Sequence, residues 1–167
     1  RGVLIPLLDN QESVAAGEMI AELYVKENNF KAAEEVYSRL ADRSKKPESI
    51  ERLAQVRYML AEGYLKEGRL KEAAEKFNEA FSTRQGSAIG EASLIKLGYI
   101  EMRLRDYGGM DSTIERLSRT YPGSNLANGF IVEAGKWLKD LKPVTAAKYF
   151  EKASINAGDA KDARALA

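Results

Sequence analysis

The sequence contains neither cysteine nor histidine among its 167 residues. Without thiolate or imidazole groups, the chain cannot form a disulfide, a structural zinc site, a haem ligand, or a Cys–His or Ser–His catalytic pair. Carboxylates are the only conventional acid–base groups that remain. We therefore expect a protein without catalytic activity, and we expect neither a cofactor nor a metal site.

An excess of charge and long apolar runs are also missing. Twenty-six Lys and Arg residues against 25 Asp and Glu residues leave a formal charge of +1, which gives no reason to expect nucleic acid or an anionic membrane as the main partner. No apolar run approaches the ~20 residues that a membrane-spanning helix needs. The longest run, Val3 to Leu8, is short and contains Pro6. The expected partner is a protein or peptide, without membrane insertion.

The chain begins at Arg1 and has no basic-then-apolar secretory leader. We therefore expect a processed or trimmed piece of a longer protein. The absence of cysteine fits a reducing cytoplasm as well as a bacterial periplasm or envelope protein that uses no disulfides. The sequence leaves the compartment open.

Only four prolines occur, and apolar residues recur at three-to-four spacing, so the chain predicts an all-α fold without a sheet. Helices of about 12 to 20 residues, joined by short connections, would be antiparallel neighbours. Breaks between helices are expected at Asn28-Asn29, Ser44 to Pro47, Gly68, Gln85 to Gly90, Gly108-Gly109, Pro122-Gly123, Lys142-Pro143 and Gly158.

Internal repetition is the strongest pattern. In the clearest copy a small residue, Ala61, is followed three positions later by an aromatic, Tyr64, and then by a turn glycine, Gly68. On the next helix Ala73 precedes the large Phe77 by four positions. This order resembles the tetratricopeptide repeat over residues 13–157. The other copies carry Ala21, Tyr24, Asn28, Ala33 and Tyr37, then Gly98, Met110 and Ile114, then Ala134, Trp137, Ala146 and Phe150.

The resemblance implies an α-α superhelix, a right-handed solenoid of antiparallel helix pairs that forms one array over residues 1–167. The repeats are expected at 14–47, 54–87, 91–124 and 127–160, with 161–167 starting a capping helix or a further repeat. Residues 45–53 should lengthen the first helix of the second repeat. The third repeat departs most from the pattern, because Glu101, Arg105 and Met110 replace the aromatic, the glycine and the alanine. We expect looser or shifted packing there.

The repeat pattern also predicts the core. Large aromatic residues should act as wedges between helices, and small residues should mark the points of closest approach. The expected wedges are Tyr24, Tyr37, Tyr64, Phe77, Trp137 and Phe150, and the expected close-approach residues are Ala21, Ala33, Ala61, Ala73, Ala134 and Ala146.

Tetratricopeptide arrays line a concave groove with the first helix of each pair, and the resemblance implies an apolar, methionine- and aromatic-containing groove here. Lys26, Lys66, Arg103 and Lys139 share one repeat position and would form a basic edge, although a cation is also favoured there by the helix dipole. The predicted partner-binding residues are Tyr58, Met59, Lys66, Ile95, Tyr99, Arg103, Ile131, Leu138 and Lys139.

Other candidate sites are weaker. Glu18, Glu22 and Glu62 could form a carboxylate site, but they are better explained as solvated helix residues. The glycine-containing segment 86–90 lacks the Lys-Ser/Thr of a phosphate-binding loop. Family members that grip a peptide C-terminal carboxylate use Lys, Asn and Arg in the groove. At the matching positions this chain has Glu18, Glu22, Met59, Ala92 and Lys96, of which only Lys96 fits in charge, so we reject that subtype.

The sequence therefore predicts a non-catalytic scaffold that binds a partner segment in an apolar, basic-edged groove. One alternative is a structural segment of a larger solenoid, packing on its own chain or self-assembling. Another is an accessory domain of an enzyme whose catalytic part is absent. The turn from Tyr121 to Ser124, in which Ser124 should cap the next helix, resembles bacterial envelope members of the family.

Overall fold

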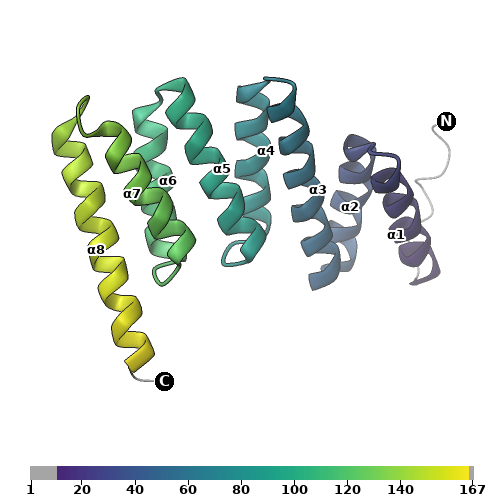
Figure 1. Cartoon of the computed structure of the whole chain (residues 1–167). Coiled ribbons are helices and arrows are strands. Elements are labelled where there is room, and N and C mark those ends of the chain that lie inside the picture. The colour runs from purple at the N-terminus through teal and green to yellow at the C-terminus, as the bar shows by residue number, and fades with distance from the viewer. Residues whose placement is uncertain (1–10, 166–167) are drawn as a thin grey trace. The chain divides into compact units, whose positions relative to one another are not determined.

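The computed structural model describes the backbone of residues 11–165 and the side chains of residues 14–158 (Figure 1). Within that range the chain is all-α and contains no strand, which confirms the predicted fold class. The apolar run Val3 to Leu8 lies outside the described residues. The helices are α1 (Gln11–Lys26), α2 (Phe30–Ser44), α3 (Pro47–Lys66), α4 (Leu70–Thr83), α5 (Ala88–Leu104), α6 (Tyr107–Thr120), α7 (Asn125–Leu138) and α8 (Pro143–Ala165).

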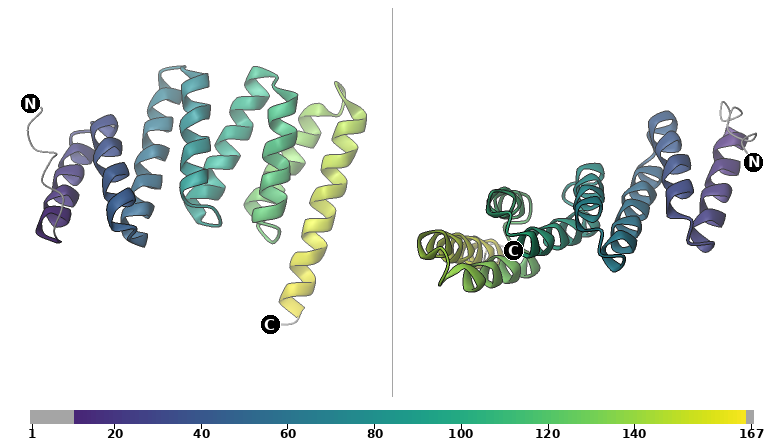
Figure 2. Two further views of the ribbon diagram at one scale, coloured as in Figure 1. Left: turned by 180° about the vertical axis from the view of Figure 1, so that it is seen from behind. Right: turned by 90° about the horizontal axis from the view of Figure 1, so that it is seen from above.

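The chain divides into two compact units, residues 1–84 (unit 1) and residues 85–167 (unit 2). In unit 1, α1 packs on α2, α2 on α3, and α3 on α4. In unit 2, α5 packs on α6 and α7 on α8, while α7 also contacts both α5 and α6. Neighbouring helices within a unit run antiparallel (Figure 2). Each predicted repeat corresponds to one helix pair, in the sequential packing of α-α superhelical repeat folds.

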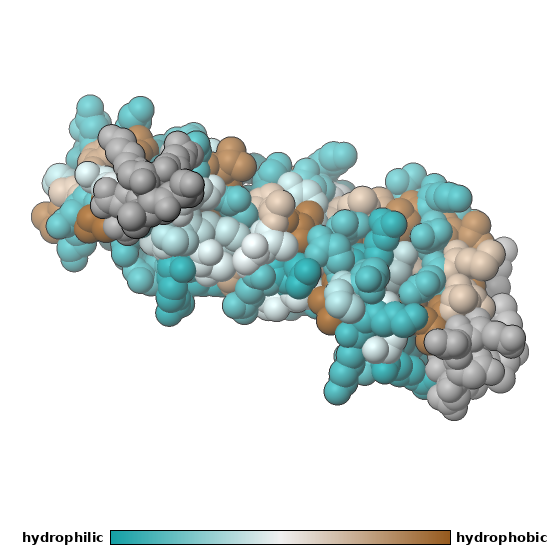
Figure 3. All heavy atoms as spheres, turned by 90° about the horizontal axis from the view of Figure 1, so that it is seen from below, coloured by the Kyte–Doolittle hydropathy of each residue, from teal (hydrophilic) through white to brown (hydrophobic). Residues whose placement is uncertain are grey.

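The helix starts follow from local capping chemistry. The side chains of Asn29, Ser87, Asp106 and Ser124 each accept a hydrogen bond from a backbone N–H in the first turn of α2, α5, α6 and α7. The predicted Ser124 cap is thus confirmed. Pro47 begins α3, which is lengthened to 20 residues as expected. Seen from below, the described surface carries many hydrophilic residues with hydrophobic residues between them (Figure 3).

Two predicted breaks are wrong. Gly108-Gly109 lies in the first turn of α6 rather than before it, because Asp106 caps the helix there. Gly158 lies inside α8, which continues to Ala165, so no separate helix begins at residue 161. A single glycine costs only about 1 kcal/mol in a helix interior. Without a following proline or a left-handed residue, that cost does not end the helix.

The predicted small residues all lie in the core. Ala21, Ala33, Ala61, Ala73 and Ala134 are fully buried, and so, almost completely, is the corresponding alanine of α8, Ala146. Each allows the facing helix to approach closely, because a larger side chain would hold the two backbones apart.

Five of the six predicted wedges are buried or half-buried, in agreement with the prediction, but Phe150 is 38% exposed. The neighbouring Tyr149, only 4% exposed, enters the core instead. Its hydroxyl donates a hydrogen bond to Asp111 of α6, which gives the buried phenol a polar partner. The Phe150 ring lies against Gly135 of α7, and no described helix follows α8 to cover its exposed part.

The third repeat accommodates its unusual residues in three ways. Arg105 adopts the left-handed conformation (φ 55°) that Gly68 (φ 76°) takes in the second repeat. Met110 is fully buried in place of an alanine. Gly98 replaces the small alanine of the first helix, and the Phe130 ring of α7 occupies the space beside it.

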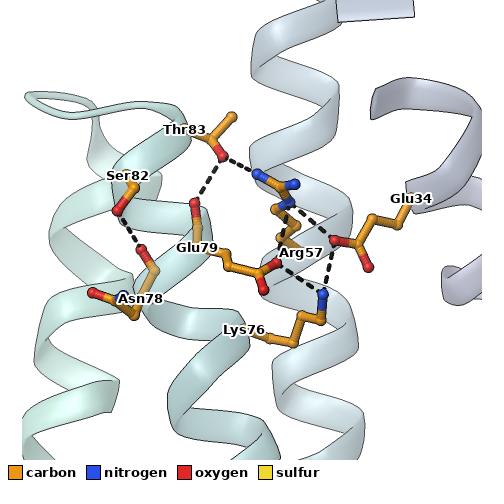
Figure 4. A network of polar contacts seen from close by, with 7 residues as sticks. All are labelled: Glu34, Arg57, Lys76, Asn78, Glu79, Ser82 and Thr83. Atoms are coloured by element: carbon orange, nitrogen blue, oxygen red, sulfur yellow. Dashed lines mark hydrogen bonds and ion pairs between the residues drawn. The ribbon is translucent and has the colours of Figure 1, made fainter. Parts of the chain in front are cut away.

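A buried ionic network joins the two repeats of unit 1 (Figure 4). The Glu34 Oε1 atom accepts hydrogen bonds from Arg57 Nε and Lys76 Nζ, both at 3.0 Å. Lys76 also donates to Glu79 at 2.8 Å, and Arg57 donates to the Thr83 hydroxyl at 2.6 Å. Burial would raise the pKa of Glu34, but the hydrogen bonds and charges of Lys76 and Arg57 outweigh it and lower the pKa.

The Gly98 contact predicts a position-specific effect of adding one methyl group. An ideal Cβ at Gly98 would lie 2.2 Å from the Phe130 ring, so Gly98→Ala should overpack the core and lower the free energy of unfolding by about 1–3 kcal/mol. The matched control is Gly129→Ala in α7, where a Cβ meets nothing within 4 Å. That variant should be neutral or gain up to about 1 kcal/mol. Urea unfolding of both variants tests the contact, and equal effects would contradict it.

The ionic network predicts a difference between adjacent glutamates of α2. Glu34→Ala removes one acceptor from two partly buried cations and should cost about 1–3 kcal/mol of unfolding free energy. Glu35→Ala removes only an exposed pair with Arg39 and should cost less than about 0.5 kcal/mol. Thermal unfolding in low salt measures both. Equal losses of unfolding free energy in the two variants would mean that the Glu34 network stabilises the fold no more than the exposed Glu35–Arg39 pair does.

Candidate functional site

A small hollow opens on the first-helix surface of unit 1, between α1 and α3. Its volume is about 160 Å³, the size of one large aliphatic side chain. The lining combines apolar groups with a charged and polar rim: Glu22, Val25, Lys26, Tyr37, Arg52, Gln55, Val56 and Met59. We refer to these eight residues as the unit 1 hollow.

The residues that line the hollow differ in how deeply they are buried. Val56 is almost fully buried against the core, whereas Met59, three residues further along α3, is 39% exposed at its opening. Tyr37 reaches the hollow from α2 and is only 2% exposed. Burial, and then the nearby Glu22 carboxylate, raise the pKa of the Tyr37 phenol. The hollow therefore offers a neutral hydroxyl and apolar carbon and sulfur atoms to a ligand.

The other residues predicted for unit 1 have different surroundings. Tyr58 is half-buried, and its ring meets Phe77 edge-on with centroids 5.3 Å apart. Tyr58 therefore contributes to the core as well as to the surface. Lys66 is exposed in the last turn of α3, as its counterpart Lys26 is in α1.

The corresponding surface of unit 2 is narrower than predicted. Ile131 and Leu138 are fully buried, so their assignment to an open binding surface is wrong. The reason is that α7 packs on α5, α6 and α8, which leaves little of its circumference open. Ile95 is half-buried, whereas Tyr99, 36% exposed, remains the main aromatic group of this surface.

Tyr99 is held in one orientation. Its hydroxyl donates a hydrogen bond to the Glu133 carboxylate of α7, and its ring meets Phe130 edge-on at a centroid distance of 5.0 Å. The bond to Glu133, together with burial, raises the pKa of Tyr99 to about 12. Because the ring is already ordered, a partner that packs on it loses little side-chain entropy. Arg103 and Lys139, the basic residues predicted for unit 2, are both exposed.

The sequence shows that Glu101 replaces the aromatic residue of the other repeats, but it does not predict the raised pKa of the Glu101 carboxyl. Its side chain is only 8% exposed, although it stands where other repeats place Tyr64 or Trp137. One carboxyl oxygen accepts a hydrogen bond from the Thr113 hydroxyl at 3.1 Å, and the other is buried without a partner. Burial is the main cause that raises the pKa of Glu101 to about 7.

Neighbouring charges modify this shift in both directions. The Asp106 carboxylate raises the pKa further, while the Thr113 hydrogen bond and the Arg116 charge lower it. A carboxyl that titrates near neutrality can serve as a general acid or base. With 8% of its surface exposed, however, Glu101 offers a substrate almost no access, so we assign it to the packing between α5 and α6.

Two other classes of site are absent from the described part of the chain. Among the described side chains, those of residues 14–158, no group of three or more Asp and Glu residues is arranged to hold a metal ion. Over residues 11–165 no helix is long and apolar enough to cross a membrane. Glu22, one of the carboxylates considered from sequence, is exposed on α1.

The raised pKa of Glu101 predicts that the free energy of unfolding depends on pH. A carboxyl whose pKa rises from 4.5 to about 7 on folding stabilises the fold while protonated, and this contribution is lost as pH rises from about 4.5 to 7. Glu101→Gln stays neutral and should be the more stable protein by about 2–3 kcal/mol near pH 8, with little difference near pH 5.

Urea unfolding at the two pH values measures this difference, with the exposed Glu151→Gln as the control. A Glu101→Gln effect that does not change with pH would show that the carboxyl is already ionised in the folded protein.

The chain resembles several chains of known structure. BtubC (BKLC) from P. vanneervenii matches 86% of this chain with a TM-score of 0.50 and 22% sequence identity. The chain spans 62% of the length of that protein. At this identity the likeness concerns the fold alone. The chain matches no protein-family model and no curated protein sequence.

Proposed function

We propose that the chain is a tetratricopeptide-like interaction module, without catalytic activity, that binds a segment of a partner protein on its first-helix surfaces. The repeat pattern of small and aromatic residues supports this assignment, as does its agreement with four antiparallel helix pairs. Modules of this kind stack helix pairs into extended binding surfaces.

The unit 1 hollow carries the proposal. Val25 and Met59 give it an apolar opening, and Met59 is more exposed than a core methionine would be. Methionine adapts its shape to different apolar partners at low energetic cost. A leucine- or methionine-sized anchor of the partner segment would fill the hollow, while Lys26 and Arg52 on the rim would favour a nearby carboxylate.

The rigid Tyr99 in unit 2 offers a second contact for the same kind of partner. Aromatic residues of fixed orientation are common among the residues that dominate interface energetics. Because Tyr99 and the unit 1 hollow belong to different units, the proposal treats them as two separate contacts and tests each alone.

A second candidate function is a structural segment of a larger assembly. Met19 and Leu23 of α1 are 68% and 56% exposed, and Ile155 of α8 is 56% exposed. Terminal repeats of solenoid proteins usually carry a polar outer face. Exposed apolar residues on α1 and α8 therefore favour coverage by further helices, of the same polypeptide or of another.

Met59 provides the test of the binding proposal. Met59→Glu places a carboxylate in an apolar opening beside Glu22, and we expect it to weaken partner binding about tenfold or more, by ~1.4 kcal/mol or more. Helix content should be unchanged, because Met59 is 39% exposed. Glu75→Gln, on an exposed position of α4, is the matched control and should bind normally.

The partner needed for this measurement can be found by photo-crosslinking. A benzophenone side chain placed at position 59 or 99 should capture it, whereas one at Glu75 should not. Capture only from position 23 or 155 would favour the structural segment. Equal capture from positions 59 and 75 would contradict binding at the first-helix surface.

A further inference from the structure

Two turns of unit 2 lie side by side at one end of its helices. They are the α5–α6 turn, at residues 105–106, and the α7–α8 turn, at residues 139–142 (Figure 1). Tyr107, the first residue of α6, stacks obliquely on Trp137 of α7 with ring centroids 6.2 Å apart. The Lys142 ammonium group lies 4.0 Å from the centre of the same Tyr107 ring. These contacts hold the two turns together.

Large apolar side chains project from both turns. Leu104, the last residue of α5, is 43% exposed. Leu141 in the second turn is 55% exposed, and Val144 in the first turn of α8 is 72% exposed. Clustered exposed apolar residues on a folded domain usually mark a contact surface.

The same turns carry cations that the described structure does not neutralise. Arg103, Arg105 and Lys139 are exposed, and none of them forms an ion pair with a described residue. The two acids of the turns are Asp106 and Asp140, and Asp106 already accepts a hydrogen bond from Gly109 as the cap of α6. The exposed apolar groups are therefore surrounded by net positive charge.

Unit 1 shows that the fold does not require this composition. At the positions equivalent to Leu104, Leu141 and Val144, its α3–α4 turn has Glu67, Gly68 and Lys71. There Arg69 pairs with Glu67 at 3.1 Å and with Glu72 at 3.0 Å, although Lys66 and Lys71 of the same turn are also exposed cations. Exposed large apolar residues therefore distinguish the turns of unit 2 from the α3–α4 turn.

We propose that the turn-edge patch of unit 2, formed by Leu104, Leu141 and Val144 with Arg103, Arg105 and Lys139, docks an acidic segment of a partner protein that carries apolar side chains between its carboxylates. The exposed cations supply the charge complementarity, and the three apolar residues supply the area removed from water. This surface shares no residue with the unit 1 hollow and does not include Tyr99.

Charge distribution favours a protein segment over an anionic membrane. Asp106 and Asp140 stand within the same two turns as the cations. A surface of uniformly negative lipid headgroups would face these carboxylates as well as the cations. A protein segment can instead place a neutral or basic residue opposite each of them, so that both signs are matched.

The test uses the whole chain and two fluorescein-labelled synthetic peptides, followed by fluorescence anisotropy. One peptide alternates glutamate with leucine and phenylalanine, and the other has lysine at every glutamate position. We expect the acidic peptide to bind about tenfold or more tightly than the basic one, and to bind more weakly as salt is added. Equal binding of the two peptides, or no saturable binding of the acidic one, would overturn the proposal.

Paired variants locate the contact. Arg105→Glu with Lys139→Glu, and separately Leu104→Ser with Val144→Ser, should each weaken binding of the acidic peptide about tenfold or more. The matched control, Lys46→Glu with Lys71→Glu at exposed positions of unit 1, should change it by less than about twofold. Similar losses in the control and the unit 2 variants would overturn the assignment to unit 2. Circular dichroism shows whether each variant keeps its helix content.

Two further measurements separate this proposal from its rivals. Because the unit 1 hollow would also accept a leucine beside a carboxylate, the peptide measurements are repeated with Met59→Glu added to each protein. The losses caused by the unit 2 variants should persist there, so that the turn-edge patch and the unit 1 hollow succeed or fail independently. Vesicles of phosphatidylcholine with phosphatidylglycerol test the membrane. If these vesicles bind the chain, lose binding in the same unit 2 variants, and the acidic peptide does not bind, a lipid surface replaces the protein segment as the ligand.

Discussion

Close approach of neighbouring helices at small side chains is the constraint from which the other features of the structure follow. Ala21 and Ala61 in unit 1, and Gly98 and Ala134 in unit 2, take the same repeat position on the first helix of each pair and are buried. A helix pair can bury only part of its apolar surface by itself, and the next pair covers the rest. The spacing at these residues sets how far apart the facing side chains lie. The unit 1 hollow lies between α1 and α3, both of which pack on α2.

Polar contacts between successive second helices add to this packing in both units. Glu34 of α2 bonds to Lys76 of α4, and Asp111 of α6 bonds to Tyr149 of α8. These two pairs occupy equivalent repeat positions. In each case the carboxylate directly follows the buried residue at the close-approach position, Ala33 or Met110. Its partner on the next second helix lies three residues after the equivalent alanine, Ala73 or Ala146. In unit 1 the donor is charged and belongs to a network, whereas in unit 2 a buried phenol, with a pKa raised by burial and by Asp111, serves instead.

The two units present different chemistry on one architecture. Unit 1 has polar turns, in one of which Arg69 pairs with two glutamates, and opens an apolar hollow between its first helices. Unit 2 closes most of its first-helix surface, because α7 is packed on three sides, and exposes apolar and basic residues at its turns. It also buries Glu101, a carboxyl whose neutral form the packing favours. A repeat fold can carry such differences because each helix pair depends mainly on its nearest neighbours.

The sequence by itself determined the helix pairs, their approximate bounds and the close-approach residues such as Ala33 and Ala73, because these follow from local spacing and from side-chain size. Tertiary structure decided which side of a helix stays open. Ile131 and Leu138 have the spacing of groove residues but are buried, since α7 contacts three helices. Tyr149 rather than Phe150 enters the core, because Asp111 lies on a helix 38 residues away and accepts its hydroxyl. Periodicity along one helix contains no information about how many neighbours surround it, so such residues could not be assigned before the helices were packed.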